Sequence, residues 1–363
     1  MGVSIEPGWW PLAGRDDELD ACAAAWAEPR TQGLFIFGAA GVGKSRLAEE
    51  LLARAAGAGW TTSRVAVAEA AVPLGPLADL IPANVDMSDP VKGFAAVARR
   101  LGVHGRRVVL VDDLHLLDAA STVVLRQLLD AGVVRLIGTI RCGTSMSDAV
   151  NALTVGGSAY RMFLTEFDVP QVEQVLQAAL GGPIGRQTVH VLHAASGGHA
   201  RYLYELVLGA LASGTLSSDG EIWALAPDEL PITARLAELI GGLLTAAGPA
   251  ARPALELLAL CEPLSLADTR SVADGTVLTG LERDGLIHVV TDGRQTTVTL
   301  AHPLYGKVLR AGLPAPRRRE LLLEQAARTE RAGADVLRLA TWYLDARGTG
   351  DLATVIVRVA GND

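Results

Sequence analysis

Short apolar runs alternate with helical patterns over the first 167 residues. The runs lie at residues 34–37, 63–67, 108–111, 134–140 and 161–167. Between them apolar residues recur at helical spacing, as in Val124, Leu125, Leu128 and Leu129. Strands that alternate with helices predict an α/β fold in which a parallel sheet is flanked by helices.

After about residue 168 the pattern becomes helical, with apolar periodicity at 172–180, 189–195 and 200–212. Helices at 254–261 and 268–272 then precede a two-stranded pattern that turns at TDGRQ, which predicts a winged-helix module. Two last helical segments favour the start of an α-helical array, although no repeat period can be measured from one pair. We therefore expect a nucleotide-binding domain at 1–167, a helical subdomain at 168–248, a winged-helix domain at 249–315 and a helical segment at 316–363.

The stretch FGAAGVGKSRLAEE at residues 37–50 fits the phosphate-loop pattern G-x-x-x-x-G-K-[ST]. An apolar run precedes it and an amphipathic helix pattern closed by Gly57 follows, so a helix N-terminus points at the bound anion. In such loops the backbone N–H groups hold phosphates and the lysine reaches the terminal ones. The nucleotide-binding residues are predicted to be Gly38, Ala39, Ala40, Gly41, Val42, Gly43, Lys44, Ser45 and Arg46. A glycine-rich turn that never meets phosphate is the disfavoured alternative.

The third apolar run ends in VVLVDDLHLLD and delivers Asp112 and Asp113 to the carboxyl edge of the sheet, where ligands bind in open α/β folds. Asp112 and Ser45 together are predicted to hold Mg²⁺, directly or through water. Asp113, the next residue, is predicted to orient or activate water. The alternative is a helix cap followed by a solvated neighbour. The role of His115 is open between packing and catalysis.

The next run, VRLIGTIRCG, presents Arg141 at its end. Arg141 is predicted to contact the γ-phosphate, the alternative being an ion pair with Asp112 or Asp113. The predicted catalytic set is Lys44, Asp113 and Arg141.

Composition narrows the class of protein. The chain has 363 residues, half of them hydrophobic, and a net charge of −8, which argues against a protein that coats nucleic acid. Its three cysteines are far apart and suggest neither a disulfide framework nor a zinc site. No signal peptide is visible, and prolines and an arginine interrupt the most apolar window, 239–261. We expect a soluble cytoplasmic protein without a membrane partner.

Acidic residues match the basic ones around the predicted wing, which favours an intramolecular role of the wing over DNA binding.

Six segments together resemble the STAND class of P-loop ATPases, specifically the large ATP-binding LuxR-type transcriptional regulators. They follow the order of that family and are PLAGRDDEL at 11–19, FGAAGVGKS at 37–45, VPLGPLADLIP at 72–82, LVDDLHLLD at 110–118, SGGHARYLYEL at 196–206 and AHPLYGKVLRAGLP at 301–314. Only the phosphate loop is a strong motif by itself.

The resemblance implies a nucleotide-binding domain, a helical domain and a winged helix that close over ADP. It implies adenine contacts from Trp10, Pro11, Leu12, Gly14 and Arg15, and a contact from His302 to the β-phosphate. The family's G-N-P motif reads Gly198, His199, Ala200 here, so Ala200 replaces the proline that packs on the adenine side. Full-length members continue into a helical-repeat sensor and a C-terminal DNA-binding helix-turn-helix.

The sequence thus favours a switch that binds ATP or ADP with Mg²⁺, hydrolyses ATP slowly, and self-associates in the ATP state. DNA binding is expected only through a C-terminal effector domain that does not occur before Asp363. The chain is either the ATPase core of a longer protein or a natural protein without an effector. The rival hypothesis is a turnover or DNA-remodelling ATPase of the origin-recognition type, which predicts a basic wing. A silent ATP-binding scaffold is disfavoured because the phosphate loop and both aspartates are intact.

Overall fold

The computed structural model describes residues 10–65, 67, 73–80, 92, 94–95, 98–99, 106–144, 146–226, 230–293, 295–331 and 336–347. The chain divides into two compact units. The first is Met1–Ala194, Gly198–Tyr204 and Gly214–Pro227, and the second is Ala195–Gly197, Glu205–Ser213 and Asp228–Asp363. The outer ends of the predicted domains 1–167 and 316–363, and part of the 72–82 segment, lie outside the described residues. The finer division into four domains remains a prediction.

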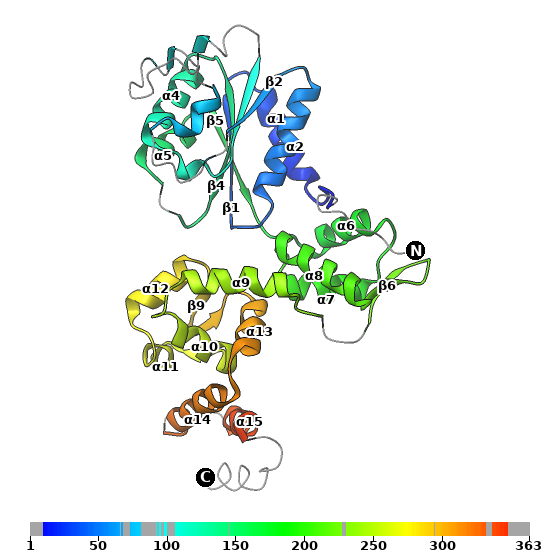
Figure 1. The fold of residues 1–363 in the computed structure, drawn as a ribbon, viewed down its shortest axis with the longest axis vertical. Coiled ribbons are helices and arrows are strands. Elements are labelled where there is room, and N and C mark those ends of the chain that lie inside the picture. Colours follow the sequence, from blue (N-terminus) through cyan, green and yellow to red (C-terminus); the bar gives the residue numbers. More distant parts are fainter. Residues whose placement is uncertain are drawn as a thin grey trace. The chain divides into compact units, whose positions relative to one another are not determined.

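The first unit is built on a five-stranded sheet in the order β2-β3-β4-β1-β5, in which every pair is parallel (Figure 1). Its strands are β1 (Gly33–Gly38), β2 (Thr61–Val65), β3 (Arg107–Val111), β4 (Arg135–Arg141) and β5 (Ala159–Leu164). The helices around it are α1 (Asp16–Ala27), α2 (Lys44–Gly57), α4 (Ala119–Asp130) and α5 (Asp148–Thr154), with single 3-10 turns at Gly75–Leu80 and Leu114–Leu116. The predicted α/β fold of a P-loop NTPase is confirmed.

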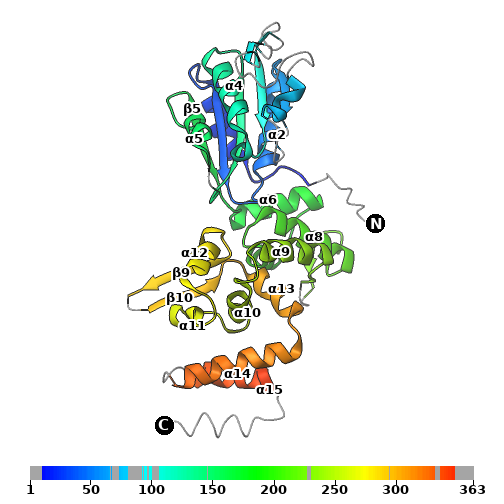
Figure 2. The same ribbon diagram turned by 60° about the vertical axis from the view of Figure 1, so that its left-hand side comes forward.

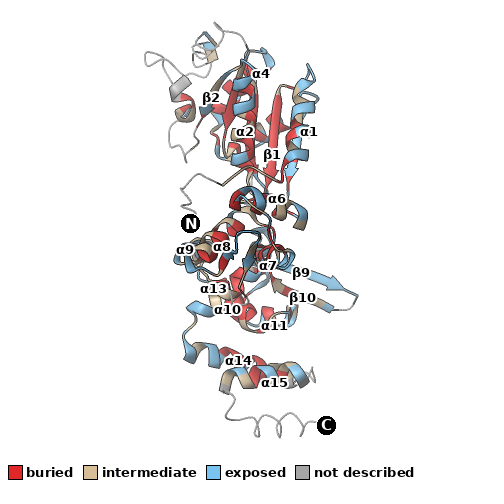
Figure 3. Cartoon of the chain, turned by 90° about the vertical axis from the view of Figure 1, so that its right-hand side faces the viewer, coloured by how far each residue is buried: buried red, intermediate tan, exposed pale blue. Residues whose placement is uncertain are grey.

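The central strand β1 is buried on both faces, because its successive side chains point to opposite sides of the sheet. Leu34 and Ile36 pack with α1 and α2, whereas Phe35 and Phe37 pack with α4 and α5. Figure 3 shows the strands as the buried layer of this unit. Two apolar cores therefore hold the sheet between the two helix pairs.

The strand register brings the candidate site residues to one edge of the sheet. Gly38, the last residue of β1, pairs with Arg141 at the end of β4. Val111 of β3 pairs with Gly138, so Asp112 leaves β3 beside Thr139 of β4. The phosphate loop, the aspartate pair and Arg141 all start from this carboxyl edge, as the sequence predicted.

Several details differ from the sequence prediction, and β2 spans Thr61–Val65 rather than 63–67. The last strand ends at Leu164 rather than at Phe167, because the Phe167 N–H leaves the sheet and donates to the carbonyl of Gly198 at 2.9 Å. A small antiparallel hairpin, β6 (Leu216–Ser218) and β7 (Trp223–Leu225), lies in the stretch predicted to be helical. Its turn contains Asp219, whose carboxylate accepts the N–H groups of Glu221 and Ile222.

Helix α6 (Val169–Leu180) belongs to the first unit, while α7 (Arg186–Ser196) and α8 (Ala200–Ser213) contribute residues to both units. The rest of the second unit contains α9 (Ala234–Ala246), α10 (Arg252–Cys261), α11 (Leu266–Arg270), α12 (Gly275–Arg283), α13 (Pro303–Gly312), α14 (Ala315–Arg331) and α15 (Val336–Arg347). Strands β8 (Leu264–Ser265), β9 (Ile287–Asp292) and β10 (Gln295–Leu300) form an antiparallel sheet in the order β8-β10-β9.

The elements of the second unit match the sequence pattern closely. Helices α10 to α12 are followed by the β9–β10 hairpin, which projects from them in Figure 2. Helix α11 starts two residues before the predicted 268–272 segment, because Ser265 caps it by accepting the Asp268 N–H. Helices α14 and α15 pack side by side. Across the described helices of both units, none combines the length and apolar composition that a membrane crossing requires.

Candidate functional site

The phosphate loop joins the end of β1 to the start of α2. Gly41 and Gly43 have φ of +78° and +110°, a backbone conformation that glycine adopts without strain. Val42 between them is fully buried in the apolar core and fixes the loop to the domain. Ala39 and Ala40 are exposed, and α2 begins at Lys44 with its N-terminus toward the loop. The predicted strand–loop–helix geometry for binding an anion is present.

Lys44 is 7 % exposed, and its ammonium donates to the Ala39 carbonyl within the loop at 2.7 Å. Burial lowers the pKa of Lys44, an effect that nearby Asp113 opposes and nearby Arg141 reinforces. A buried ammonium held by a single carbonyl is an incompletely compensated charge. An anionic group over the loop would complete its set of partners.

Ser45, Asp112 and Thr139 form a continuous hydrogen-bonded chain. The Ser45 hydroxyl donates to Asp112 Oδ1 at 2.9 Å, and the Thr139 hydroxyl donates to the same oxygen at 2.6 Å. The second Asp112 oxygen lies 3.9 Å from the guanidinium of Arg64. A carboxylate and a hydroxyl are hard oxygen ligands of the kind that Mg²⁺ prefers when phosphates and water complete its shell. Among the described residues no cluster of three or more His, Cys, Asp or Glu offers a metal site made of protein alone.

Asp113 has an unusual backbone, with φ of +52°. Its N–H donates to the Thr139 hydroxyl at 2.9 Å, and its side chain is 41 % exposed. The His115 side chain is only 5 % exposed, and its Nδ1 lies 3.9 Å from Asp113 Oδ1 without a hydrogen-bond partner in the described part of the chain. Burial lowers the pKa of His115, and the Asp113 carboxylate acts in the opposite direction. The neutral imidazole is thus packed directly behind the second aspartate.

Arg141 ends β4 with an exposed side chain. The sequence left an ion pair with Asp112 or Asp113 open, but no ion pair of Arg141 occurs among the residues that the structure describes. Its charge is close enough to lower the pKa of Lys44. Arg141 and the phosphate-loop lysine therefore lie near each other at the carboxyl edge of the sheet.

The start of α8 closes the other side of the loop, over a cavity of about 490 Å³. The His199 ring nitrogen Nε2 lies 2.6 Å from the Ala40 carbonyl, and the Arg201 N–H donates to the Gly41 carbonyl at 3.2 Å. The cavity is lined by Trp10, Gly41, Gly43, Lys44, Ser45, Arg46, Glu49, Ala200, Arg201 and Tyr204. The structure thus brings Trp10 and Ala200 together with the phosphate loop.

Two of these residues, His199 and Arg201, did not emerge as site residues from the sequence. Their contacts join residues about 160 positions apart along the chain, which no local pattern reveals. One signal was available: Arg201 directly follows Ala200, in the first turn of a helix that Gly197 and Gly198 precede.

The segment predicted to contact adenine, residues 10–15, is held mainly by contacts with other residues of the first unit. Arg15 is 2 % exposed and donates to the Thr165 carbonyl at 2.6 Å, while its guanidinium lies 4.1 Å from the centre of the Phe167 ring. Gly14 sits against α6, where a Cβ would come within 2.9 Å of the Gln171 carbonyl. Leu12 packs on the apolar core, Pro11 is half-buried, and the Trp10 ring meets Tyr204 edge-on at 5.3 Å. Of these residues, Trp10 alone lines the cavity.

His302 lies in the second unit and is 9 % exposed. Its Nδ1 accepts the Leu304 N–H at 3.1 Å and so caps α13, and its Nε2 lies 2.6 Å from the Ser196 carbonyl. Both ring nitrogens are thus engaged by backbone groups. The predicted contact with a β-phosphate would have to replace the bond to Ser196, and it remains a prediction.

Comparison with known proteins agrees with this geometry. Residues 11–92 match the family model of the AAA ATPase domain. No curated protein matches the sequence at a significant level. Among solved structures, ORC1 of Aeropyrum pernix in complex with DNA is 17 % identical with a TM-score of 0.49, and the match covers 87 % of this chain and 96 % of that one. A RuvB variant of Thermotoga maritima is 15 % identical with a TM-score of 0.43, covering 84 % and 99 %.

Both structural likenesses are too distant to bear on function. The family match, by contrast, includes β1, the phosphate loop and α2, which are the elements that build the site. Together with the parallel sheet, this match supports a P-loop ATPase core of the AAA type in the first unit.

Proposed function

We propose that the protein is a signalling switch that binds ATP and ADP, hydrolyses ATP slowly, and controls a LuxR-type transcriptional regulator of the STAND class. ADP holds the closed state in this proposal, and ATP permits self-association. The observation that carries the nucleotide part is the hydrogen-bonded chain from Ser45 through Asp112 to Thr139, beside the buried Lys44.

Each residue has a defined task in this proposal. Lys44, which donates to the Ala39 carbonyl, would turn to the terminal phosphates, and Ser45 with Asp112 would hold a Mg²⁺ ion that neutralises phosphate charge when bound. Thr139 keeps Asp112 and Asp113 in place. Asp113, backed by His115, orients the attacking water.

We expect slow hydrolysis because only an arginine of the same chain is assigned to the γ-phosphate. Arg141 is assigned in cis to the γ-phosphate, and no arginine from another molecule is assigned. An additional arginine finger changes such rates by roughly 10³ to 10⁵. We expect turnover below about 1 s⁻¹, the lower end of the range of ordinary enzymes.

Arg201 is a second cation that we assign to the nucleotide. Its backbone N–H holds Gly41 and its side chain lines the cavity, so it is positioned to report which nucleotide is bound. Arg201→Ala should weaken ATP more than ADP, because the γ-phosphate carries the additional charge. Arg186→Ala, an exposed position at the start of α7 in the same unit, is the matched control. Equal loss for the two nucleotides would contradict this assignment.

A switch needs several contacts to change together. Moving a two-state equilibrium from 1:99 to 99:1 requires a difference of about 5.5 kcal/mol between the two states. One hydrogen bond to a charged group supplies about 1.5 to 3 kcal/mol. The proposal therefore assigns the discrimination between ATP and ADP to a set of residues, Lys44, Arg141, Arg201 and His302.

The second candidate function is a turnover or DNA-remodelling ATPase with a DNA-binding winged helix. Three helices followed by the β9–β10 hairpin fit a winged helix. However, these two strands contain no Lys or Arg, so they lack the basic footprint expected of a DNA reader. This favours the switch.

The test begins with the purified protein. Denaturation and identification of any released nucleotide should yield ADP. Calorimetry with Lys44→Ala should show loss of tight binding, whereas Lys307→Ala in the second unit should not change it. Retained affinity within about threefold in Lys44→Ala would overturn the phosphate-loop assignment. Hydrolysis that duplex DNA stimulates would favour the second candidate.

A further inference from the structure

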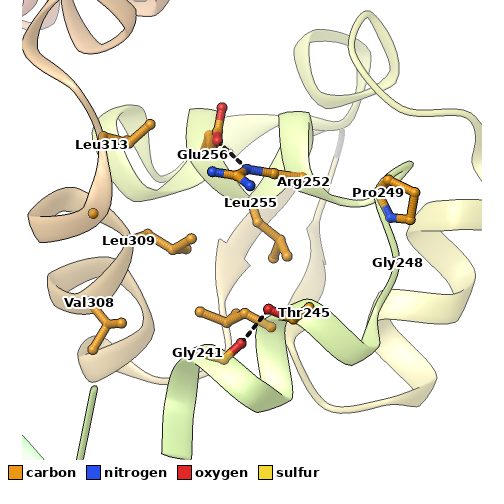
Figure 4. Close-up of a pocket in the computed structure, with 12 residues that line it drawn as sticks. Gly241, Thr245, Gly248, Pro249, Arg252, Leu255, Glu256, Val308, Leu309 and Leu313 are labelled. Atoms are coloured by element: carbon orange, nitrogen blue, oxygen red, sulfur yellow. Dashed lines mark hydrogen bonds and ion pairs between the residues drawn. The ribbon is translucent and has the colours of Figure 1, made fainter. Parts of the chain in front are cut away.

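A separate cavity of about 350 Å³ lies within the second unit, between α9, α10 and α13 (Figure 4). This volume falls within the range of small-molecule sites. The lining residues are Gly241, Leu244, Thr245, Gly248, Pro249, Arg252, Leu255, Glu256, Val308, Leu309, Gly312 and Leu313. None of them belongs to the nucleotide site described above.

The walls of the cavity are apolar. Leu244 comes from α9, Leu255 from α10, and Val308 and Leu309 from α13. Figure 4 shows Leu255 and Leu309 on facing sides of the open space. Such walls suit a hydrocarbon chain, because burial of apolar surface is the main source of affinity in sites of this kind.

Glycines keep the space open. A Cβ added at Gly241, Gly248 or Gly312 would meet no atom within 4 Å. Gly241 lies in the middle of α9, where glycine weakens a helix relative to alanine. A side chain at Gly241, which lines the cavity, would therefore extend from the cavity wall without a clash at its Cβ.

The polar side of the cavity carries one ion pair. The Arg252 Nε–H donates to Glu256 Oε1 at 2.7 Å, and Arg317, itself paired with Glu320 at 2.6 Å, reaches Glu256 Oε2 at 3.5 Å. The Glu256 side chain is 8 % exposed, and that of Arg252 is 72 % exposed. Because both Glu256 oxygens already face arginines, a cationic ligand would have to compete for them. An anion, in contrast, could use the outward N–H groups of Arg252.

We infer that this cavity binds a small amphipathic carboxylate, with its hydrocarbon chain between α9, α10 and α13 and its carboxylate on the terminal N–H groups of Arg252. The inference is independent of the proposed switch, because every lining residue lies in the second unit. It gives this unit a small-molecule site with a defined chemical preference: an apolar chain and a negative head group.

The test is calorimetry of the full chain with decanoate, with 1-decanol and decylamine as probes of equal chain length. Decanoate should bind at least tenfold more tightly than either of the others. Absence of decanoate binding up to millimolar concentration would overturn the inference, as would tighter binding of decylamine.

Two adjacent glycines provide a matched pair of variants. Gly241→Leu places a side chain in the cavity and should weaken decanoate at least tenfold. Gly242 is also in α9 with open space around it, but it does not line the cavity, so Gly242→Leu should stay within twofold of the parent. Equal affinities for the two variants would overturn the site.

A third variant addresses the head group and does not alter the walls. Arg252→Gln should weaken decanoate about tenfold and leave 1-decanol unchanged. Unchanged decanoate binding would refute the carboxylate assignment. Circular dichroism melting shows whether each variant folds, and if Gly241→Leu does not, the Arg252→Gln comparison decides by itself.

Discussion

The hydroxyl of Thr139 donates to Asp112 Oδ1 at 2.6 Å and accepts the Asp113 N–H at 2.9 Å. Thr139 is completely buried, so water cannot replace either bond. One hydroxyl therefore fixes the carboxylate assigned to the metal and the backbone of the residue assigned to water. This relationship explains how Asp113 is held at a positive φ at the carboxyl edge of the sheet.

Thr139→Val should damage both stability and catalysis. It preserves the shape of the side chain but leaves a buried N–H without its acceptor, which costs about 1 to 3 kcal/mol. We expect ATP hydrolysis to fall by at least roughly tenfold, equivalent to about 1.4 kcal/mol in the barrier. Urea denaturation and a steady-state ATPase assay measure the two effects.

A control variant at a second buried threonine distinguishes the effect on stability from the effect on ATP hydrolysis. Thr154 in α5 is fully buried and donates to the Asn151 carbonyl at 3.0 Å, away from the site. Thr154→Val should change stability alone. If the two variants hydrolyse ATP equally fast, Thr139 does not position the aspartates.

Asp112→Asn should discriminate between nucleotides. The substitution removes the charge that faces the metal but keeps an oxygen for Ser45 and Thr139. Binding of ADP without Mg²⁺ should stay close to that of the parent, whereas binding of ATP with Mg²⁺ should weaken about tenfold or more. Calorimetry of both ligands decides, and equal losses would argue against a metal role for Asp112.

The strongest sequence predictions rested on local patterns. The phosphate loop, its flanking strand and its helix are contiguous, so the motif from Gly38 to Ser45 specified their conformation. Because the strands were predicted to be parallel, Asp112 and Arg141 were expected at one edge of the sheet, and the strand register agrees. What could not be predicted was the partner of each side chain, such as the bond between Thr139 and Asp112.

The residues that sequence reasoning missed depend on tertiary contacts. Arg201 meets Gly41 because α8 folds back on the loop, a tertiary contact to which only the position next to Ala200 pointed. The β6–β7 hairpin has strands too short for a clear alternation, although its Asp219-Gly220 turn was a usable signal. The cavity of the second unit needs three helices from separate parts of the sequence.

Stability should depend on pH through His115. Burial lowers the pKa of His115 from its usual value near 6.5, and Arg141 and Lys44 add to this effect while Asp113 opposes it. The unfolded chain then binds the proton more readily, so this contribution is complete above about pH 6.5 and is lost as the pH falls toward the folded-state pKa. Urea denaturation across this range should show a shallower loss for His115→Gln. His190→Gln, at an exposed position of α7, should follow the parent, and identical profiles for all three proteins would refute the effect.

Thiol labelling should report on nucleotide. Burial raises the pKa of Cys22 and of Cys261 to about 12, so both remain protonated and shielded. Cys142 is exposed beside Arg141, and its N–H donates to the Gly38 carbonyl at 3.0 Å. Dithionitrobenzoate should therefore react quickly with one thiol in the folded protein and with all three in denaturant. ATP with Mg²⁺ should slow the fast reaction, and Cys142→Ser should abolish it. Rapid labelling of the Cys142→Ser variant would contradict this prediction.

His302 allows the cap and the switch to be tested apart. Its Nδ1 caps α13 and its Nε2 meets the Ser196 carbonyl, so His302→Ala should lower stability through the loss of both bonds, with about 0.5 to 2 kcal/mol from the cap. His302→Asn keeps a capping oxygen but lacks the length of the ring, so it should lose the Ser196 bond alone and melt between His302→Ala and the parent.

If the imidazole also donates to the β-phosphate of ADP, both variants lose a contact that is made in only one state. Such a contact is worth about 1.5 to 3 kcal/mol, so a fluorescent ADP analogue should leave both variants roughly ten- to a hundredfold faster than it leaves the parent. Stopped-flow release, measured beside small-angle scattering of the same samples, gives the rate and the radius of gyration. An Asn variant that releases ADP and scatters like the parent would mean that His302 has only a structural role at Ser196 and α13, and the ADP latch would have to be sought elsewhere.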